Sequence, residues 1–201
     1  MAAVKGALKS IAAKSQERGG FVGKLGLEVG KWSGPRLVKD PEVIYDADIK
    51  SSSFKLIAKN ITMSNSKVDQ ANLEWDGEYY KVIVTANGAV VPVHTAPAPD
   101  LKTAINMLGV MPSVTSILVP ALVLGPPEKI DSIKFMSELS FVDETEDSVR
   151  NLRFVVQDDD NVQWNTLVSV EAETLKLKSI YVQTATPKRI RYALNFTYPQ
   201  S

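Results

Sequence analysis

The sequence has no cysteine among its 201 residues. Without thiols the chain can form no disulfide, and it offers neither a thiolate nucleophile nor the sulfur ligands of zinc knuckles and iron–sulfur clusters. It has a single histidine, His94, beside prolines in an apolar stretch. Histidine is the side chain most often used for acid–base catalysis near neutral pH, and metal sites usually need two or three. We therefore interpret His94 as a structural or surface histidine and expect no enzyme activity.

Motifs for nucleotide phosphates, for a serine nucleophile and for paired-histidine metal sites are also missing. The longest stretch without a charged residue is 103–127, but four prolines and several polar residues interrupt it, so we expect a buried helix-turn-strand or an apolar subunit contact rather than a membrane span. Lysines break every early apolar run, which excludes a classical signal peptide. We expect a protein of a virion or of the host cytoplasm.

Charge is unevenly distributed along a chain whose net charge is zero. Residues 1–39 hold eight basic and two acidic side chains, a net charge of +6, and the remainder therefore carries −6. A basic segment beside an acidic body suggests an anionic partner. That partner is nucleic acid, an anionic membrane or a neighbouring subunit, and a solvated terminal helix is the alternative. The candidate contact residues are Lys5, Lys9, Lys14, Arg18, Lys24 and Lys31.

Residues 2–17 show the pattern of an amphipathic helix, with an apolar stripe at Val4, Leu8 and Ile11 that continues to Ser15. Gly19-Gly20 is a helix stop, and the glycines of 21–32 favour an extended segment. Ser33-Gly34-Pro35 has the composition of a junction. We predict a basic N-terminal arm at 1–34 and a separate body at 35–201 that folds without it.

The body has the pattern of β-strands. Asp76-Gly77 and Asn87-Gly88 predict two hairpins in series across 73–93, preceded by strands at 43–49 and 54–62. A short helix is expected at 100–108. Further strands are expected at 133–141, 151–156, 162–166, 167–172 and 175–182, and the strict alternation from Arg189 to Tyr198 predicts a half-buried final strand. The fold class is mainly β, a β-sandwich or jelly-roll-like body with one or two short helices, or a barrel.

Two acidic clusters are oxygen-rich enough to be weighed as a Ca²⁺ site. They comprise Asp143 and Glu144 in one segment, and Asp158, Asp159 and Asp160 in another, although solvated hairpin tips explain both. Lys188, Arg189 and Arg191 form a basic group that could contact phosphate or an acidic loop of a neighbour.

These observations favour a non-enzymatic, self-assembling structural protein, such as a viral or phage capsid component whose basic arm contacts nucleic acid or adjacent subunits. One alternative is a peripheral membrane scaffold that binds anionic lipid through the N-terminal helix. A second alternative is a small ligand-binding β-barrel. No cofactor is expected other than the candidate Ca²⁺.

Overall fold

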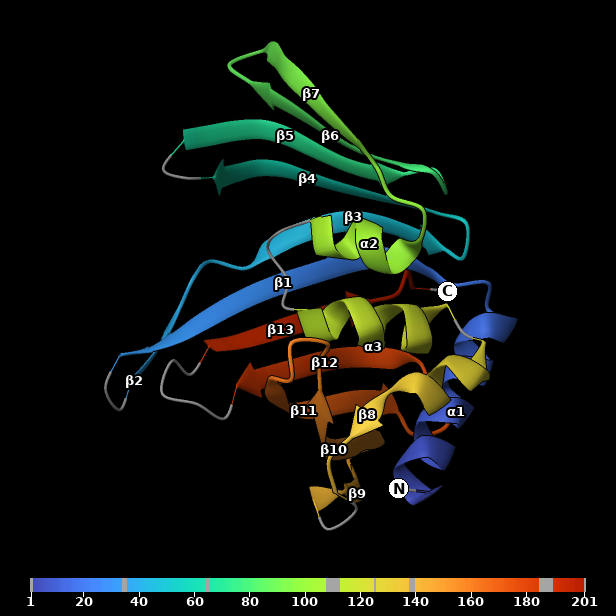
Figure 1. Cartoon of the computed structure of the whole chain (residues 1–201). Helices are drawn as coiled ribbons and strands as arrows, with labels where there is room; N and C mark the ends of the chain where they lie inside the picture. The colour runs from blue at the N-terminus through green and yellow to red at the C-terminus, as the bar shows by residue number, and fades with distance from the viewer. Residues whose placement is uncertain are drawn as a thin grey trace.

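The computed structural model describes residues 2–33, 36–63, 66–107, 113–124, 126–137, 140–184 and 190–200. In these residues thirteen strands form a single antiparallel sheet (Figure 1). The strands of its first half are β1 (Phe21–Ser33), β2 (Arg36–Lys39), β3 (Val43–Lys50), β4 (Ser53–Met63), β5 (Ser66–Trp75), β6 (Tyr79–Ala86) and β7 (Ala89–Pro97). The second half comprises β8 (Lys134–Phe135), β9 (Val142–Glu146), β10 (Val149–Gln157), β11 (Gln163–Glu171), β12 (Leu177–Thr184) and β13 (Ile190–Thr197).

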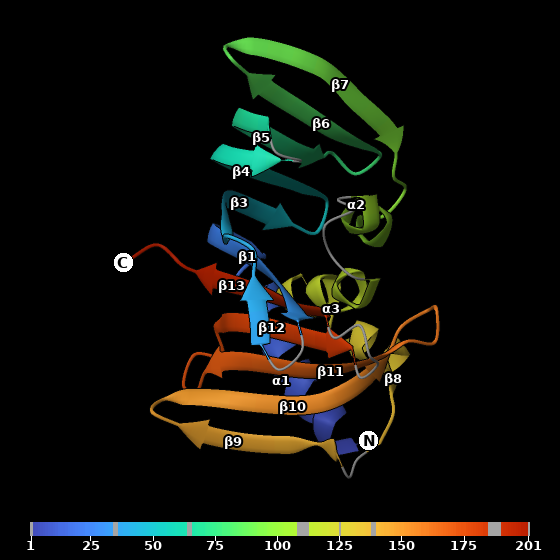
Figure 2. The ribbon, with the colours of Figure 1, turned by 90° about the vertical axis from the view of Figure 1, so that its left-hand side faces the viewer.

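The strand order across the sheet is β7-β6-β5-β4-β3-β1-β13-β12-β11-β10-β8, while β2 pairs with β1 and β9 with β10. β3 to β7 form one meander and β10 to β13 another, and β1 joins them by pairing with β3 on one side and β13 on the other. The sheet is curved and does not close, and the helices lie on its concave side (Figure 2). The prediction of a mainly β protein is confirmed, but the sandwich or jelly-roll body is corrected to one open sheet. Alternating strands indicate one buried face and do not reveal whether a sheet or helices cover it.

Helix α1 (Ala2–Glu17) matches the sequence prediction. Its stripe is buried, with Val4, Leu8 and Ile11 at most 1% exposed. Gly19 and Gly20 end the helix in left-handed conformations, at φ of 77° and 116°, and their amides bond to carbonyls of its last turn.

The N-terminal segment differs from the separate arm that we predicted at 1–34. β1 lies in the middle of the sheet, and both α1 and β1 contribute buried side chains to the same core as the body. A β-strand buries its backbone polar groups by pairing, and β1 pairs on both sides, so residues 21–33 are integral to the sheet. The residues Gly34 and Pro35 at the predicted boundary lie outside the described residues.

Both predicted hairpins are present. Asn87 and Gly88 have φ of 52° and 73°, the two positive values that a tight turn between β6 and β7 requires. Asp76 closes the other turn by accepting hydrogen bonds from the amides of Glu78 and Tyr79.

The region between the two meanders departs further from the sequence prediction. α2 (Leu101–Met107) is the expected short helix, but Ser113–Val123 forms a second helix, α3, instead of a strand. A 3-10 helix, η1 (Pro127–Ser132), precedes β8, which has two residues where a longer strand was expected. The strands predicted at 162–166 and 167–172 are one strand, β11. Within the described residues, no helix is long and apolar enough to cross a membrane.

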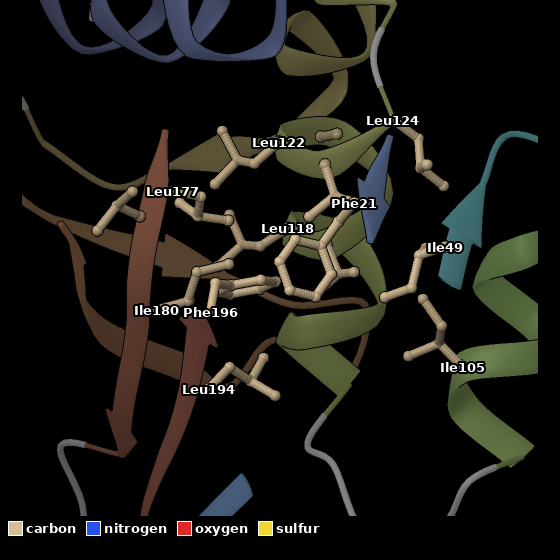
Figure 3. Close-up of a cluster of buried hydrophobic side chains, with 14 of the residues drawn as sticks. Phe21, Ile49, Ile105, Leu118, Leu122, Leu124, Leu177, Ile180, Leu194 and Phe196 are labelled. Atoms are coloured by element: carbon tan, nitrogen blue, oxygen red, sulfur yellow. The ribbon is translucent and has the colours of Figure 1, made fainter. Parts of the chain in front are cut away.

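The main core lies between the concave face and the helices. Phe21, Leu194 and Phe196 from the sheet meet Leu118 and Leu122 of α3 there (Figure 3). The rings of Phe21 and Phe196 pack edge to face with centroids 5.1 Å apart.

Candidate functional site

The concave face of the sheet, which the helices cover, borders a small apolar cavity. A cavity of about 20 Å³ lies between this face and the helices. Six strand residues and two helix residues line it: Leu25, Ile49, Phe54, Leu56, Leu194, Phe196, Ile105 and Val119. The volume would admit about one water molecule, but no polar side chain lines the cavity to hydrogen-bond it, so the space is a dry apolar gap.

The helix side of the cavity comes from the charge-free stretch noted in the sequence. Asp100 directly precedes α2, and its carboxylate accepts a 2.7 Å hydrogen bond from the amide of Thr103. This bond lowers the pKa of Asp100. Trp75 of β5 donates an indole hydrogen bond of 2.8 Å to the carbonyl of Ala98, just before α2. α2 has seven residues and α3 contains Pro120, which lacks an amide hydrogen. Such short or interrupted helices depend on packing for their stability.

Helix α1 packs beside α3 and η1, and two of its lysines bond to η1. Lys9 forms a 2.7 Å ion pair with Asp131 of η1, and Lys5 donates a 3.2 Å hydrogen bond to the Asp131 carbonyl. The hydrogen bond from Lys9 lowers the pKa of Asp131. α1 therefore ties η1, and through it the end of α3, to the rest of the molecule.

Three of the other predicted contact residues, Lys14, Lys24 and Arg18, also have oxygen partners within the chain. Lys14 pairs with Glu17 at 2.7 Å, Lys24 pairs across the sheet with Asp46, and Arg18 donates to the carbonyls of Thr174 and Leu175. Lys31 is exposed on β1. The structure thus spreads these six residues over helix α1, the turn that follows it and the central strand β1. Contact with nucleic acid or an anionic membrane stays a prediction, and the buried apolar stripe of α1 is occupied by protein.

The acidic residues of the candidate Ca²⁺ site are not brought together. Asp143 lies on β9 and makes a two-pronged pair with Arg150 at 2.8 and 2.6 Å, and this hydrogen bonding lowers the pKa of Asp143. Glu144 is exposed on the same strand. Among the residues that the structure describes, no three His, Cys, Asp or Glu side chains are grouped as a metal site would require.

The 157–161 segment is a hairpin tip, as the sequence suggested, but Asp158 is 1% exposed and organises it. One carboxylate oxygen accepts the amides of Asp160 and Val162 at 3.0 and 2.8 Å, and the other accepts the indole of Trp164 at 2.8 Å. Asp159 instead pairs with Lys102 of α2 at the surface. Because one carboxylate accepts all three hydrogen bonds, the geometry of the turn explains why an aspartate stands at position 158.

His94 is exposed on β7, at the edge of the sheet. Arg191 lies on β13, whereas Lys188 and Arg189 fall outside the described residues. The sequence analysis did not identify the cavity, because its lining residues are distributed from position 25 to position 196 and each has the composition of ordinary core. The charge-free stretch 103–127 was the available signal.

No protein-family model matches the sequence, and the search of curated proteins found no match. Among solved structures, the chain is similar to a LolA superfamily protein from Nitrosomonas europaea. The TM-score is 0.36 at 9% identity, and the alignment covers 96% of this chain and 93% of the other. A TM-score of this size assigns neither a family nor a function.

Proposed function

We propose that the protein binds an elongated apolar ligand, such as an acyl chain, between the concave face of the sheet and helices α2 and α3. The observation that supports this most directly is the composition of the cavity wall. One side is the continuous sheet, and the other is two short helices whose lining residues, Ile105 and Val119, lie in the charge-free stretch 103–127. This is a form of the ligand-binding alternative considered from the sequence, with an open sheet in place of a closed barrel.

The cavity is too small for such a ligand as it stands, so binding requires the helices to move away from the sheet. The segment is suited to this movement because α2 is short and Pro120 interrupts the hydrogen bonding of α3. Elements of low local stability are the ones that open in binding proteins. A bound chain would replace the lost helix contacts, since each buried methylene contributes about 0.8 kcal/mol.

The test is a titration of the full-length protein with a fluorescent fatty acid, with unlabelled fatty acid as competitor. We expect saturable, competable binding. Leu56→Trp should weaken it at least about tenfold, because the larger side chain fills the cavity from the sheet side.

The matched control is Ile57→Trp, one residue along β4 and directed to the opposite face, which should leave the affinity unchanged. Melting curves of both variants establish that they are folded. Absence of acyl-chain binding by the wild type would reject the proposal, as would equal affinities for the two tryptophan variants.

Self-assembly into a shell or virion component remains a second proposal, supported by the open edge of the sheet. β7 lies at the end of the strand order and exposes Val90 and Val91, 66% and 43% of their surface. An apolar edge strand with free backbone groups is a template for pairing with another copy. Size-exclusion chromatography with light scattering tests it, and a strict monomer at high concentration would contradict it.

A further inference from the structure

A second hollow lies on the convex face of the sheet, opposite the helices, and its volume is about 560 Å³. Phe154, Thr166 and Val182 are buried toward the core, so the residues that alternate with them on β10, β11 and β12 face the other way. We call this hollow the convex groove. Its main lining residues are Arg153, Val155, Asn165, Leu167, Tyr181 and Arg191. The volume is within the range of small-molecule sites.

The strand register arranges these side chains in two rows. Arg153 lies opposite Leu167, which lies opposite Tyr181. In the next row Val155 is followed by Asn165, Gln183 and Arg191. The groove therefore has apolar side chains at its floor, two amides beside them, and a guanidinium group at each end.

Arg191 is held in a defined position. Its guanidinium lies over the ring of Tyr181, 4.7 Å from the centroid. The Tyr181 hydroxyl donates a 3.4 Å hydrogen bond to the side-chain oxygen of Asn195, and the Asn195 amide donates a 2.9 Å bond to Glu42. This chain of contacts directs Arg191 from β13 toward the middle of the groove.

Neither Arg153 nor Arg191 forms an ion pair with another residue that the structure describes, whereas Arg150 on the same strand as Arg153 pairs with Asp143. The Arg191 guanidinium lies over Tyr181 of β12, and β12 is two strand spacings, about 10 Å, from β10, which carries Arg153. Two long arginine side chains can therefore converge on one anion. Guanidinium forks match carboxylate and phosphate oxygens.

We propose that the convex groove binds a small soluble organic anion, a phosphate monoester or carboxylate with an apolar or aromatic body. The anionic group contacts Arg153, Arg191 and the amide of Gln183, and the body lies on Val155 and Leu167. This site is on the opposite face from the cavity, so it is independent of acyl-chain binding.

The experiment is a titration of the full-length protein with phenyl phosphate, followed by calorimetry and by NMR of the backbone and side-chain amides. We expect saturable binding with shifts centred on Asn165 and Gln183. Arg153→Gln and Arg191→Gln should each weaken it about tenfold. The control is Arg150→Gln, on the same strand but the opposite face, which should bind as the wild type does.

Two further probes distinguish the contribution of the anionic group from that of the apolar body. Phenol has the same body without the charge and should not bind, and inorganic phosphate should bind about tenfold more weakly than phenyl phosphate. Binding that both arginine variants retain, or no saturable binding at millimolar phenyl phosphate, would overturn the proposal. Binding to phosphatidylglycerol vesicles but not to phenyl phosphate would also overturn it, by indicating a membrane surface.

Discussion

The side chain of Glu42 occupies the space above Gly26 in which any other residue at position 26 would place its Cβ. Because glycine has no Cβ to fill that space, Glu42 can lie over β1 and accept the hydrogen bond from Asn195. The glycine therefore positions Asn195, and through Asn195 the ring on which Arg191 lies.

Gly26→Ala tests this relationship. We expect Glu42 to be displaced and phenyl phosphate affinity to fall several-fold. The free energy of unfolding should change by less than about 1 kcal/mol, because alanine in a strand offsets the lost hydrogen bond. Glu42→Ala should reproduce the loss of affinity. If Gly26→Ala binds as tightly as the wild type, the contact has no role in positioning Arg191.

Adjacent residues of the final strand, β13, differ in burial. Phe196 is 7% exposed and packs on Phe21, whereas Thr197 is exposed. Phe196→Ala should lower the free energy of unfolding by roughly 3–5 kcal/mol, through lost burial and the cavity left behind. Thr197→Ala should cost less than about 1 kcal/mol. Chemical denaturation of both variants measures the difference, and equal values would contradict the burial of Phe196.

Asp158 should be structural rather than calcium-binding. Asp158→Ala leaves two amides and an indole without their acceptor, so we expect a loss of roughly 2–4 kcal/mol in unfolding free energy. The control Asp160→Ala should cost far less, since Asp160 is exposed. Adding millimolar Ca²⁺ should leave the melting temperature unchanged. A clear rise in Tm that Asp158→Ala abolishes would restore the calcium interpretation.

Tyr80 should make the protein sensitive to alkali. Burial, with a smaller contribution from Tyr45, raises the pKa of Tyr80 to about 12. The unfolded chain loses the Tyr80 proton near pH 10, while the folded protein keeps it. The part of the unfolding free energy linked to this group is therefore fully present below about pH 10 and is lost as pH rises toward 12. Tyr80→Phe should make this loss shallower. Denaturation curves from pH 9 to 12 measure it, and parallel curves for both proteins would contradict the prediction.

The sequence predicted the elements whose signals are local. Asn87-Gly88 marked a hairpin, and the spacing of Leu8 and Ile11 marked the buried stripe of α1, because turns and helix faces are determined by neighbouring residues. The position of β1 was not predicted, since its pairing with β3 and β13 depends on residues far along the chain. The glycines of 21–32 indicated an extended segment without indicating its neighbours.

The candidate sites were predictable only in part. α3 has no charged residue, so no amphipathic period separated helix from strand in that stretch. Arg191 was noted in the sequence, but its proximity to Tyr181 follows from the register of β12 and β13. Asp158 was a candidate Ca²⁺ ligand, and the sequence did not predict that it is buried and accepts a hydrogen bond from Trp164.

The pairing of β1 with β13 bears on how the protein is made. Lys24 lies opposite Thr197, so strands from the first and last parts of the described chain are neighbours at the centre of the sheet. Among the strands that the structure describes, β1 leaves the ribosome first and its second partner, β13, leaves last. One edge of β1 must therefore stay unpaired until synthesis of β13 is complete, a long-range closure that slows folding and exposes an apolar strand to aggregation in the interval.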